Sequence, residues 1–216
     1  MIDFSNTLLR KIPAWILYAL GVIPAVVLWG LGLQNHLGPD PVKALEHEFG
    51  LLSLQFLIAA LAIRPLREVT GLNLMRFRRA IGLMAFFYAA MHFFVWLAFD
   101  RQLDWPRILE DLTKRPFIIV GFAAFLILVP LAVTSNNLSN RRLGGEYWRK
   151  LHRLAYAATA LAAVHFVWLV KAWPPEPLIY AAIVASLLLY RAIPRRFLRG
   201  RGLKMRPGRG VEKKLS

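Results

Sequence analysis

Six long apolar runs limit what this chain can fold into. They cover residues 14–33, 44–63, 80–99, 117–133, 151–171 and 178–193, and the last is the shortest. A helix needs about 20 apolar residues to cross the hydrocarbon core of a bilayer, and this many apolar runs are not typical of a soluble domain. We therefore predict an all-α integral membrane protein, a bundle of six transmembrane helices.

The charged residues between these runs predict the orientation of the bundle. The formal net charge is +16, and Lys and Arg gather in the second connection, in the fourth connection and after residue 191. Connection 100–115 mixes acidic and basic residues, and 173–177 carries one Glu and no basic residue. Because cytoplasmic loops carry the excess of Lys and Arg, we predict that both termini are cytoplasmic. The sequence offers no basic soluble domain for nucleic acid.

The chain divides into a predicted membrane domain, residues 1–195, and a basic tail, residues 196–216. The tail is rich in Gly and charge and lacks hydrophobic periodicity, so we expect it to be mobile. Its glycines follow no strand, so they form no dinucleotide fingerprint and predict no nicotinamide-binding domain. The chain has no Cys, which leaves His, Met, carboxylates or the backbone as metal ligands.

Two of the five histidines are predicted to face each other inside the bilayer. His92 lies twelve residues into the third run and His165 fourteen residues into the fifth, and both runs enter from the cytoplasmic side. Ionisable residues at such depth usually face the bundle interior. Two neutral imidazoles across a gap are the ligands of a six-coordinate heme b. The alternative is a pair of histidines that only form hydrogen bonds between helices.

Small and aromatic residues surround both histidines, in the segments GLMAFFYAAMHFFVWL and LAYAATALAAVHFVWL. The small residues leave room for a planar ring, although they would also allow close helix packing. Trp96 and Trp168 lie about one turn outward of the two histidines, and we interpret both as residues of the aromatic belt rather than cofactor contacts.

The remaining three histidines indicate a cofactor site less specifically. His152 precedes His165 by thirteen residues, which leaves the two about 140° apart on an ideal helix. The position fourteen before His92 is Arg78, a poor iron ligand but a good partner for propionates or phosphates. His152 with Arg78 and Arg79 therefore suits a heme edge or an anionic cofactor such as a flavin phosphate. His36 and His47 are interpreted as solvated or interfacial.

Several segments resemble the heme-binding membrane subunits of bacterial protein-methionine-sulfoxide reductase systems, within the ferric reductase and NADPH oxidase superfamily. The segments that carry this resemblance are LGPDPVKALEH, RPLREVTG, RRAIGLMAFFYAAMHF, KRPFIIVGF, LAVTSN and WRKLHRLAYAATALAAVHFVW. The resemblance implies heme ligands at His92, His152 and His165 and a cofactor-binding residue at Arg78. The wider superfamily has two histidines on each helix, so Arg78 departs from a symmetric two-heme pattern.

The resemblance also implies a function. It implies an FMN, electrons from quinol or a cytoplasmic flavin reductase, a periplasmic molybdenum-containing methionine sulfoxide reductase as acceptor, and a place in the bacterial inner membrane. We predict an electron-transfer subunit that carries out no bond chemistry itself. The alternatives are a small-molecule transporter, which would need an intramembrane charge pair or broken helices, and a heme-free scaffold.

Overall fold

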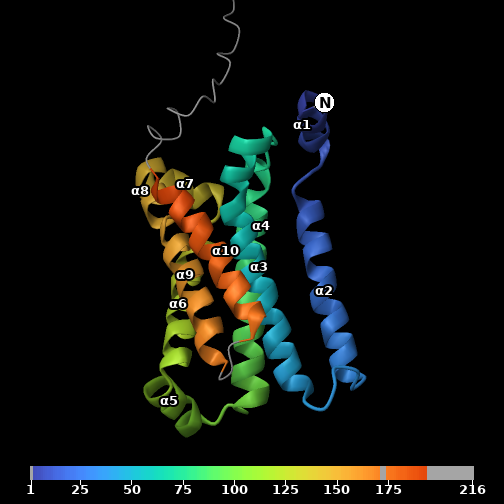
Figure 1. Cartoon of the computed structure of the whole chain (residues 1–216), viewed down its shortest axis with the longest axis vertical. Helices are drawn as coiled ribbons and strands as arrows, with labels where there is room; N and C mark the ends of the chain where they lie inside the picture. Colours follow the sequence, from blue (N-terminus) through green and yellow to red (C-terminus); the bar gives the residue numbers. More distant parts are fainter. Residues whose placement is uncertain (1, 171–173, 194–216) are drawn as a thin grey trace, which may run out of the picture.

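The computed structural model describes residues 2–170 and 174–193, and within them all regular structure is helical (Figure 1). The elements are α1 Ile2–Lys11, α2 Trp15–Leu33, α3 Pro41–Thr70, η1 Met75–Phe77, α4 Arg78–Val95, η2 Trp96–Asp100, α5 Trp105–Lys114, α6 Pro116–Val133, α7 Asn137–Leu143, α8 Gly145–Leu151, α9 Leu154–Leu169 and α10 Pro175–Ala192. The predicted all-α class is confirmed for this part of the chain. Tail residues 196–216 lie outside the described residues, so the division at 195 stays a prediction.

Four helical segments of the described chain are long and apolar enough to cross a membrane: Trp15–Leu33, Pro41–Thr70, Met75–Asp100 and Pro116–Val133. Helix α9 has 16 residues, about 24 Å at 1.5 Å per residue. Helix α10 has 18 residues but begins with Pro175, Glu176 and Pro177 and carries Arg191 in its last turn. The count of six membrane crossings therefore stays a prediction.

The fifth apolar run differs from the single helix that we predicted from residue 151. Helix α8 ends at Leu151, residues His152 and Arg153 form a turn, and α9 begins at Leu154. The backbone N–H of His152 still donates to the carbonyl of Trp148. Because the helix is interrupted here, the angle of about 140° between His152 and His165 does not apply.

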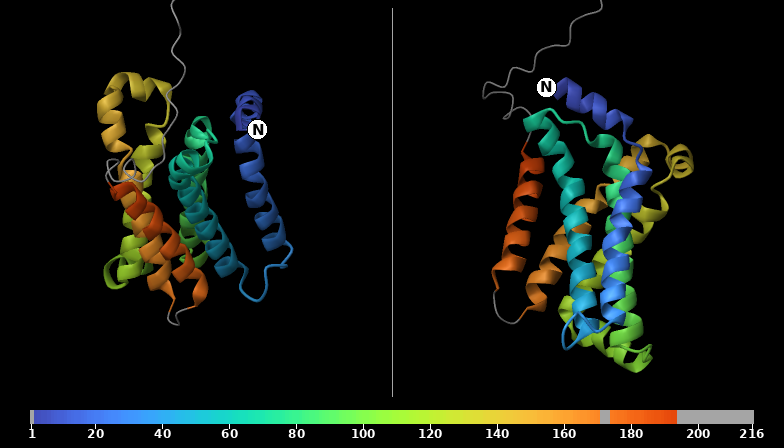
Figure 2. Two further views of the ribbon diagram at one scale, coloured as in Figure 1. Left: turned by 45° about the horizontal axis from the view of Figure 1, so that its top comes forward. Right: turned by 90° about the vertical axis from the view of Figure 1, so that its right-hand side faces the viewer.

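Two helix pairs, α3 with α4 and α6 with α9, form the centre of the bundle (Figure 1). The buried Ser53 hydroxyl of α3 donates to the carbonyl of Ala85 in α4 over 2.9 Å. Helix α2 lies along the outer side of the first pair (Figure 2). The buried Tyr88 hydroxyl donates to the carbonyl of Gly21 in α2 over 2.5 Å, and a Cβ at Gly21 would lie 3.0 Å from the Cε of Met84. Helix α10 packs on α9 and α3.

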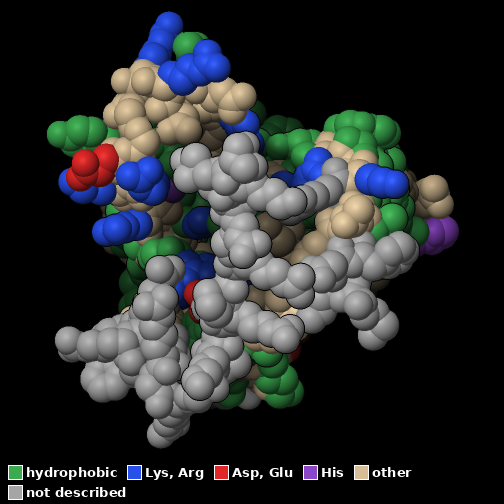
Figure 3. Space-filling model, turned by 90° about the horizontal axis from the view of Figure 1, so that it is seen from above, with side chains coloured by type: hydrophobic (Ala, Val, Ile, Leu, Met, Phe, Trp, Pro, Cys, Tyr) green, Lys and Arg blue, Asp and Glu red, His purple; other side chains and the backbone are tan. Residues whose placement is uncertain are grey.

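Helix α1 and the end of the described chain at α10 lie at one end of the bundle, together with α7 and α8, and α5 lies at the other end (Figure 1). The view onto the first end shows many Lys and Arg side chains and few acidic ones (Figure 3). The charged residues of the connections α3–α4 and α6–α9 meet there: Arg64, Arg67, Glu68, Arg76, Arg78, Arg79, Arg141, Arg142, Glu146, Arg149, Lys150 and Arg153. We call this the basic end, and the end with α5 the opposite end.

Candidate cofactor site

The structure brings His92 of α4 and His165 of α9 together, as the sequence predicts. Their ring centroids are 6.2 Å apart and their planes are inclined by 76°. Two metal–nitrogen bonds of about 2 Å each, together with the radii of two five-membered rings, amount to about 6 Å. The pair is therefore spaced for one metal ion bound between the two imidazoles.

Each imidazole is oriented by a backbone carbonyl of a neighbouring helix. The Nδ1 of His92 lies 2.7 Å from the carbonyl oxygen of Glu46 in α3, and the Nδ1 of His165 lies 2.7 Å from the carbonyl oxygen of Phe117 in α6. A carbonyl only accepts, so both Nδ1 atoms carry the proton and both Nε2 lone pairs are free for a metal. Hydrogen bonds of this kind fix the orientation and raise the basicity of metal-binding histidines.

A glycine stands one helical turn after each of these carbonyls. A Cβ at Gly121 would lie 2.7 Å from the Nδ1 of His165, and a Cβ at Gly50 would lie 3.0 Å from the Nδ1 of His92. Side chains of a helix tilt toward its N-terminus, so a side chain at position i+4 would cover the carbonyl of residue i. The two glycines leave the carbonyls of Glu46 and Phe117 open to the imidazoles.

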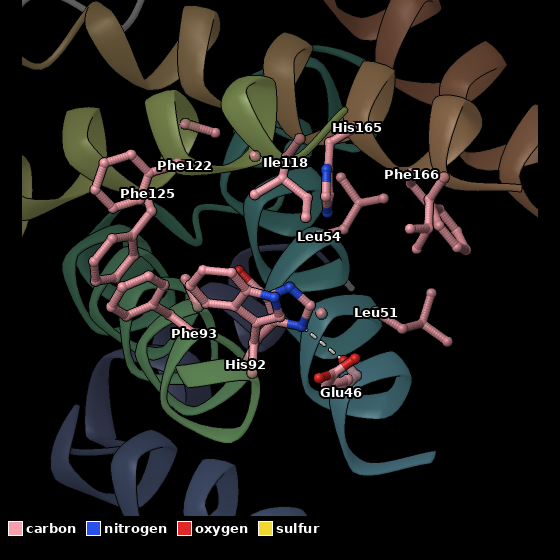
Figure 4. Close-up of a pocket in the computed structure, with 18 of the residues that line it drawn as sticks. Glu46, Leu51, Leu54, His92, Phe93, Ile118, Phe122, Phe125, His165 and Phe166 are labelled. Atoms are coloured by element: carbon pink, nitrogen blue, oxygen red, sulfur yellow. Dashed lines mark hydrogen bonds between the residues drawn. The ribbon is translucent and has the colours of Figure 1, made fainter. Parts of the chain in front are cut away.

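The two histidines line an apolar cavity between α3, α4, α6 and α9, and Figure 4 shows both rings pointing into it. Most of its lining is aliphatic or aromatic, including Leu51, Leu54, Leu57, Phe93, Ile118, Phe122, Phe125, Leu128, Phe166 and Leu169. Such a lining suits a large, flat, mostly apolar guest.

Ion pairs connect the helices near the opposite end of the bundle. Asp111 of α5 is 4% exposed and pairs with Arg101 at 2.5 Å and with Arg115 at 2.9 Å. Lys43 of α3 pairs with Glu46 at 2.9 Å and with Asp100 at 2.8 Å. This network connects α5 and η2 to the turn of α3 whose carbonyl holds His92.

The two tryptophans interpreted as belt residues occupy different environments. Trp168 is 53% exposed on α9, as a belt residue would be. Trp96 lines the cavity, and among the described residues its buried Nε1 has no hydrogen-bond partner. The spacing along the sequence could have shown this difference. On an ideal helix Trp96, four residues after His92, lies about 40° around the helix from that histidine, whereas Trp168, three residues after His165, lies about 60° away in the other direction.

His152 lies near the basic end, away from the histidine pair. Its Nε2 is 3.1 Å from the Thr134 hydroxyl, and its ring stacks on Trp148 with centroids 3.8 Å apart. Trp148 in turn donates its Nε1–H to the carbonyl of Thr134. The positive charge of the exposed Arg78 acts on His152 electrostatically. With five histidines in the chain, none of the others stands opposite His152 as His165 stands opposite His92.

The guanidinium groups near His152 differ in their contacts. Arg79 donates to the carbonyl of Ser135 and to Asn137, which fixes the start of α4 to the segment after α6. Arg191 of α10, which the sequence did not single out, donates to the Tyr156 hydroxyl and to the carbonyl of Leu61, each over 2.8 Å. Arg191 also lies within electrostatic range of Arg78.

The two histidines that we set aside lie toward the opposite end of the bundle. His36 is exposed in the connection between α2 and α3. His47 is exposed and lies 3.6 Å from Glu48, but it also contributes to the lining of the cavity near Phe166. The interpretation of His47 as an interfacial residue therefore leaves out its place in the cavity lining.

Known proteins with similar sequences identify the class of this fold. Residues 47–171 match the family described as ferric reductase like transmembrane component. The protein-methionine-sulfoxide reductase heme-binding subunits MsrQ of Brucella ovis, Brucella canis and Brucella suis are each 51% identical over 193 residues, which cover 89% of this chain and 87% of each relative.

This chain therefore belongs to the ferric reductase like transmembrane family, in the group of the MsrQ subunits. It is a multi-pass membrane protein, and the regular structure of its described residues is all helical.

Proposed function

We propose that this chain is a membrane electron-transfer subunit that binds heme b between His92 and His165. The observation that carries the proposal is the spacing of the pair, 6.2 Å between ring centroids, with both Nδ1 atoms donating to backbone carbonyls. Heme supplies a one-electron couple at an iron with two nitrogen ligands. The protein fixes axial ligation, burial and hydrogen bonding, which set the potential of such a couple.

The residues present fit this cofactor. Both ligands are imidazoles with a free Nε2, and the cavity around them is lined mostly by apolar side chains. Gly50 and Gly121 provide the space that brings each imidazole against its carbonyl. Each of these features holds a ligand in place.

At the basic end, the proposal includes an FMN near Arg78 and His152. Arg64, Arg78 and Arg191 come from three different helices, and the last is influenced by the charges of the other two. Guanidinium groups pair well with phosphates. Trp148 and His152 add a stacked aromatic surface beside them. His152 serves there as a contact to an anionic cofactor or to a heme edge, and as an iron ligand only if a second heme is present.

The direction of transfer follows from the distribution of charge. The basic end is predicted to face the cytoplasm, so electrons enter there from quinol or a cytoplasmic flavin reductase and leave at the opposite end, beside α5. The acceptor is a periplasmic molybdenum-containing methionine sulfoxide reductase, which repairs oxidised envelope proteins. The name of the Brucella relatives, protein-methionine-sulfoxide reductase heme-binding subunit, supports a methionine sulfoxide reductase as the partner. The proposed location is the bacterial inner membrane.

Optical spectra of the detergent-purified protein, oxidised and reduced, test the proposal together with a heme count per chain. We expect a low-spin b-type spectrum that His92→Ala and His165→Ala each abolish. His36→Ala, in an exposed connection, is the control and keeps the spectrum. About one heme per chain leaves the basic end to the flavin, and about two require an iron site at His152. A normal spectrum in both ligand variants, or a protein that binds no heme, would refute the proposal.

A further inference from the structure

Helix α5 carries two large apolar side chains that the described part of the chain leaves mostly uncovered. Trp105 is 65% exposed and Leu109 is 60% exposed. They are four residues apart, which places them about 40° apart on an ideal helix, so they form one strip along α5 that we call the apolar strip. Exposed apolar side chains that lie together mark a contact with a membrane or with another protein.

The other faces of α5 have different surroundings. Asp111 is buried and Leu112 lines the cavity, so one face packs on the bundle. Arg107 and Lys114 have exposed side chains and lie about 160° and 140° around an ideal helix from Leu109. The charged face is therefore opposite the apolar strip. This arrangement is typical of a helix that lies in the plane of a membrane surface.

The connections of α5 fix its level relative to the membrane. Four residues separate α5 from the membrane span Met75–Asp100, and Arg115 alone separates it from the span Pro116–Val133. Residues 117–119, at the start of that second span, are already apolar, so the hydrocarbon begins within about one helical turn, about 5 Å, of the end of α5. Helix α5 is thus held at the membrane surface at the opposite end of the bundle (Figure 1).

We propose that α5 binds the lipid surface, with Trp105 and Leu109 inserted between the lipid headgroups and the acyl chains. Tryptophan is enriched at this depth of a bilayer. Because Leu112 of the same helix lines the cavity, the contact joins one wall of the cavity to the membrane surface. The acceptor that we propose at this end would then contact the charged face of α5 rather than the apolar strip.

The ion pairs of this segment make the lipid contact apolar rather than electrostatic. The basic residues each pair with a nearby acid: Arg107 with Asp104, Lys114 with Glu110, and Arg115 with Asp111. A helix that attaches through charge needs unpaired Lys or Arg to attract anionic lipids. We therefore expect α5 to bind a membrane of neutral phosphatidylcholine as well as one that contains anionic lipid.

Spin labels on α5 test this contact, since the chain has no Cys and one introduced Cys can be labelled alone. Leu109→Cys places the label on the apolar strip. Arg107→Cys is the matched control, because its side chain is 67% exposed and points to the opposite side of the same helix. In nanodiscs of phosphatidylcholine, the label at position 109 should be relaxed by molecular oxygen, which dissolves in acyl chains. It should lose most of the relaxation by a water-soluble nickel chelate that the label at position 107 shows.

The other outcomes each overturn the inference. Equal relaxation by the nickel chelate at the two positions would place the apolar strip in water, where a soluble partner could bind it. Protection of position 109 from both reagents would mean that another protein, such as a second copy of this chain, covers the strip. Protection from nickel that appears only after anionic lipid is added would show that charge, and not the apolar strip, attaches α5. None of these results bears on heme binding by His92 and His165.

Discussion

Substitution of Gly121 by Ala should damage the proposed heme site more than the same substitution of Gly50, the other glycine that contacts a ligand histidine. The new Cβ would lie 2.7 Å from Nδ1 and 2.8 Å from Cε1 of His165, whereas ordinary contact begins at 3.4 Å. The ring must therefore retreat by about 0.7 Å, which stretches its 2.7 Å contact with the Phe117 carbonyl to the limit of a hydrogen bond.

The magnitude follows from the bond that is lost. Partners of metal-bound histidines typically contribute 10–100-fold to metal affinity, so we expect faster heme release by about this factor and a partial change from low-spin to high-spin iron. Gly50→Ala should have the same effect to a smaller degree, because its Cβ would lie 3.0 Å from His92 Nδ1 and requires a shift of only about 0.4 Å.

Gly82→Ala is the matched control on α4, since a Cβ there meets nothing within 4 Å. Alanine also favours the helix over glycine by up to about 1 kcal/mol, so this variant should keep its spectrum and its thermal stability. The assay combines the optical spectrum with the rate of heme transfer to apomyoglobin. If Gly121→Ala were to match Gly82→Ala in both, the glycines would not position the imidazoles and the reasoning would be wrong.

Three further predictions concern the scaffold. Asp111→Asn leaves Arg101 and Arg115 without their shared buried carboxylate, so it should lower the free energy of unfolding in detergent by about 1.5–3 kcal/mol. The control is Glu110→Gln, which changes an exposed pair with Lys114 and should leave the free energy of unfolding unchanged. Tyr88→Phe removes the bond to Gly21 and should cost about 1 kcal/mol, with faster hydrogen exchange in α2; unchanged exchange would show that packing alone holds α2. Arg191→Lys cannot reproduce both guanidinium bonds and should speed exchange in the last turn of α10, with α2 as the internal reference.

The membrane helices and the histidine pair could be predicted because both depend on distances along one chain. The length of an apolar run predicts a membrane helix. His92 lies twelve residues and His165 fourteen residues from the start of its run, so two helices that enter from the same side place them at similar depth. His92 and His165 therefore meet in the structure. The partners of their Nδ1 atoms could not be predicted, since Glu46 and Phe117 lie 46 and 48 residues away and their selection depends on the rotation of α3 and α6.

Local breaks in helix geometry account for the other differences. The turn at His152 and Arg153 interrupts what we read as one apolar run, because hydropathy measures solvent preference and not the continuity of backbone hydrogen bonds. Trp96 begins the π segment after Val95; its residue type does not separate it from Trp168, although its spacing of four residues from His92 could have done so. Arg191 could not be singled out because its acceptors, Tyr156 and Leu61, come together only when α10 docks.

The two histidines lie in two different helix pairs, His92 in α3–α4 and His165 in α6–α9, and this has a consequence for biogenesis. Neither the α3–α4 hairpin nor the α6–α9 pair holds more than one of the two proposed heme ligands. On this proposal, a nascent chain cannot bind heme between both histidines until His165 has left the ribosome and α9 has docked. Cofactor insertion is then a late event that locks an assembled bundle. A truncated product ending before α9 should reach the membrane without the colour of the finished protein.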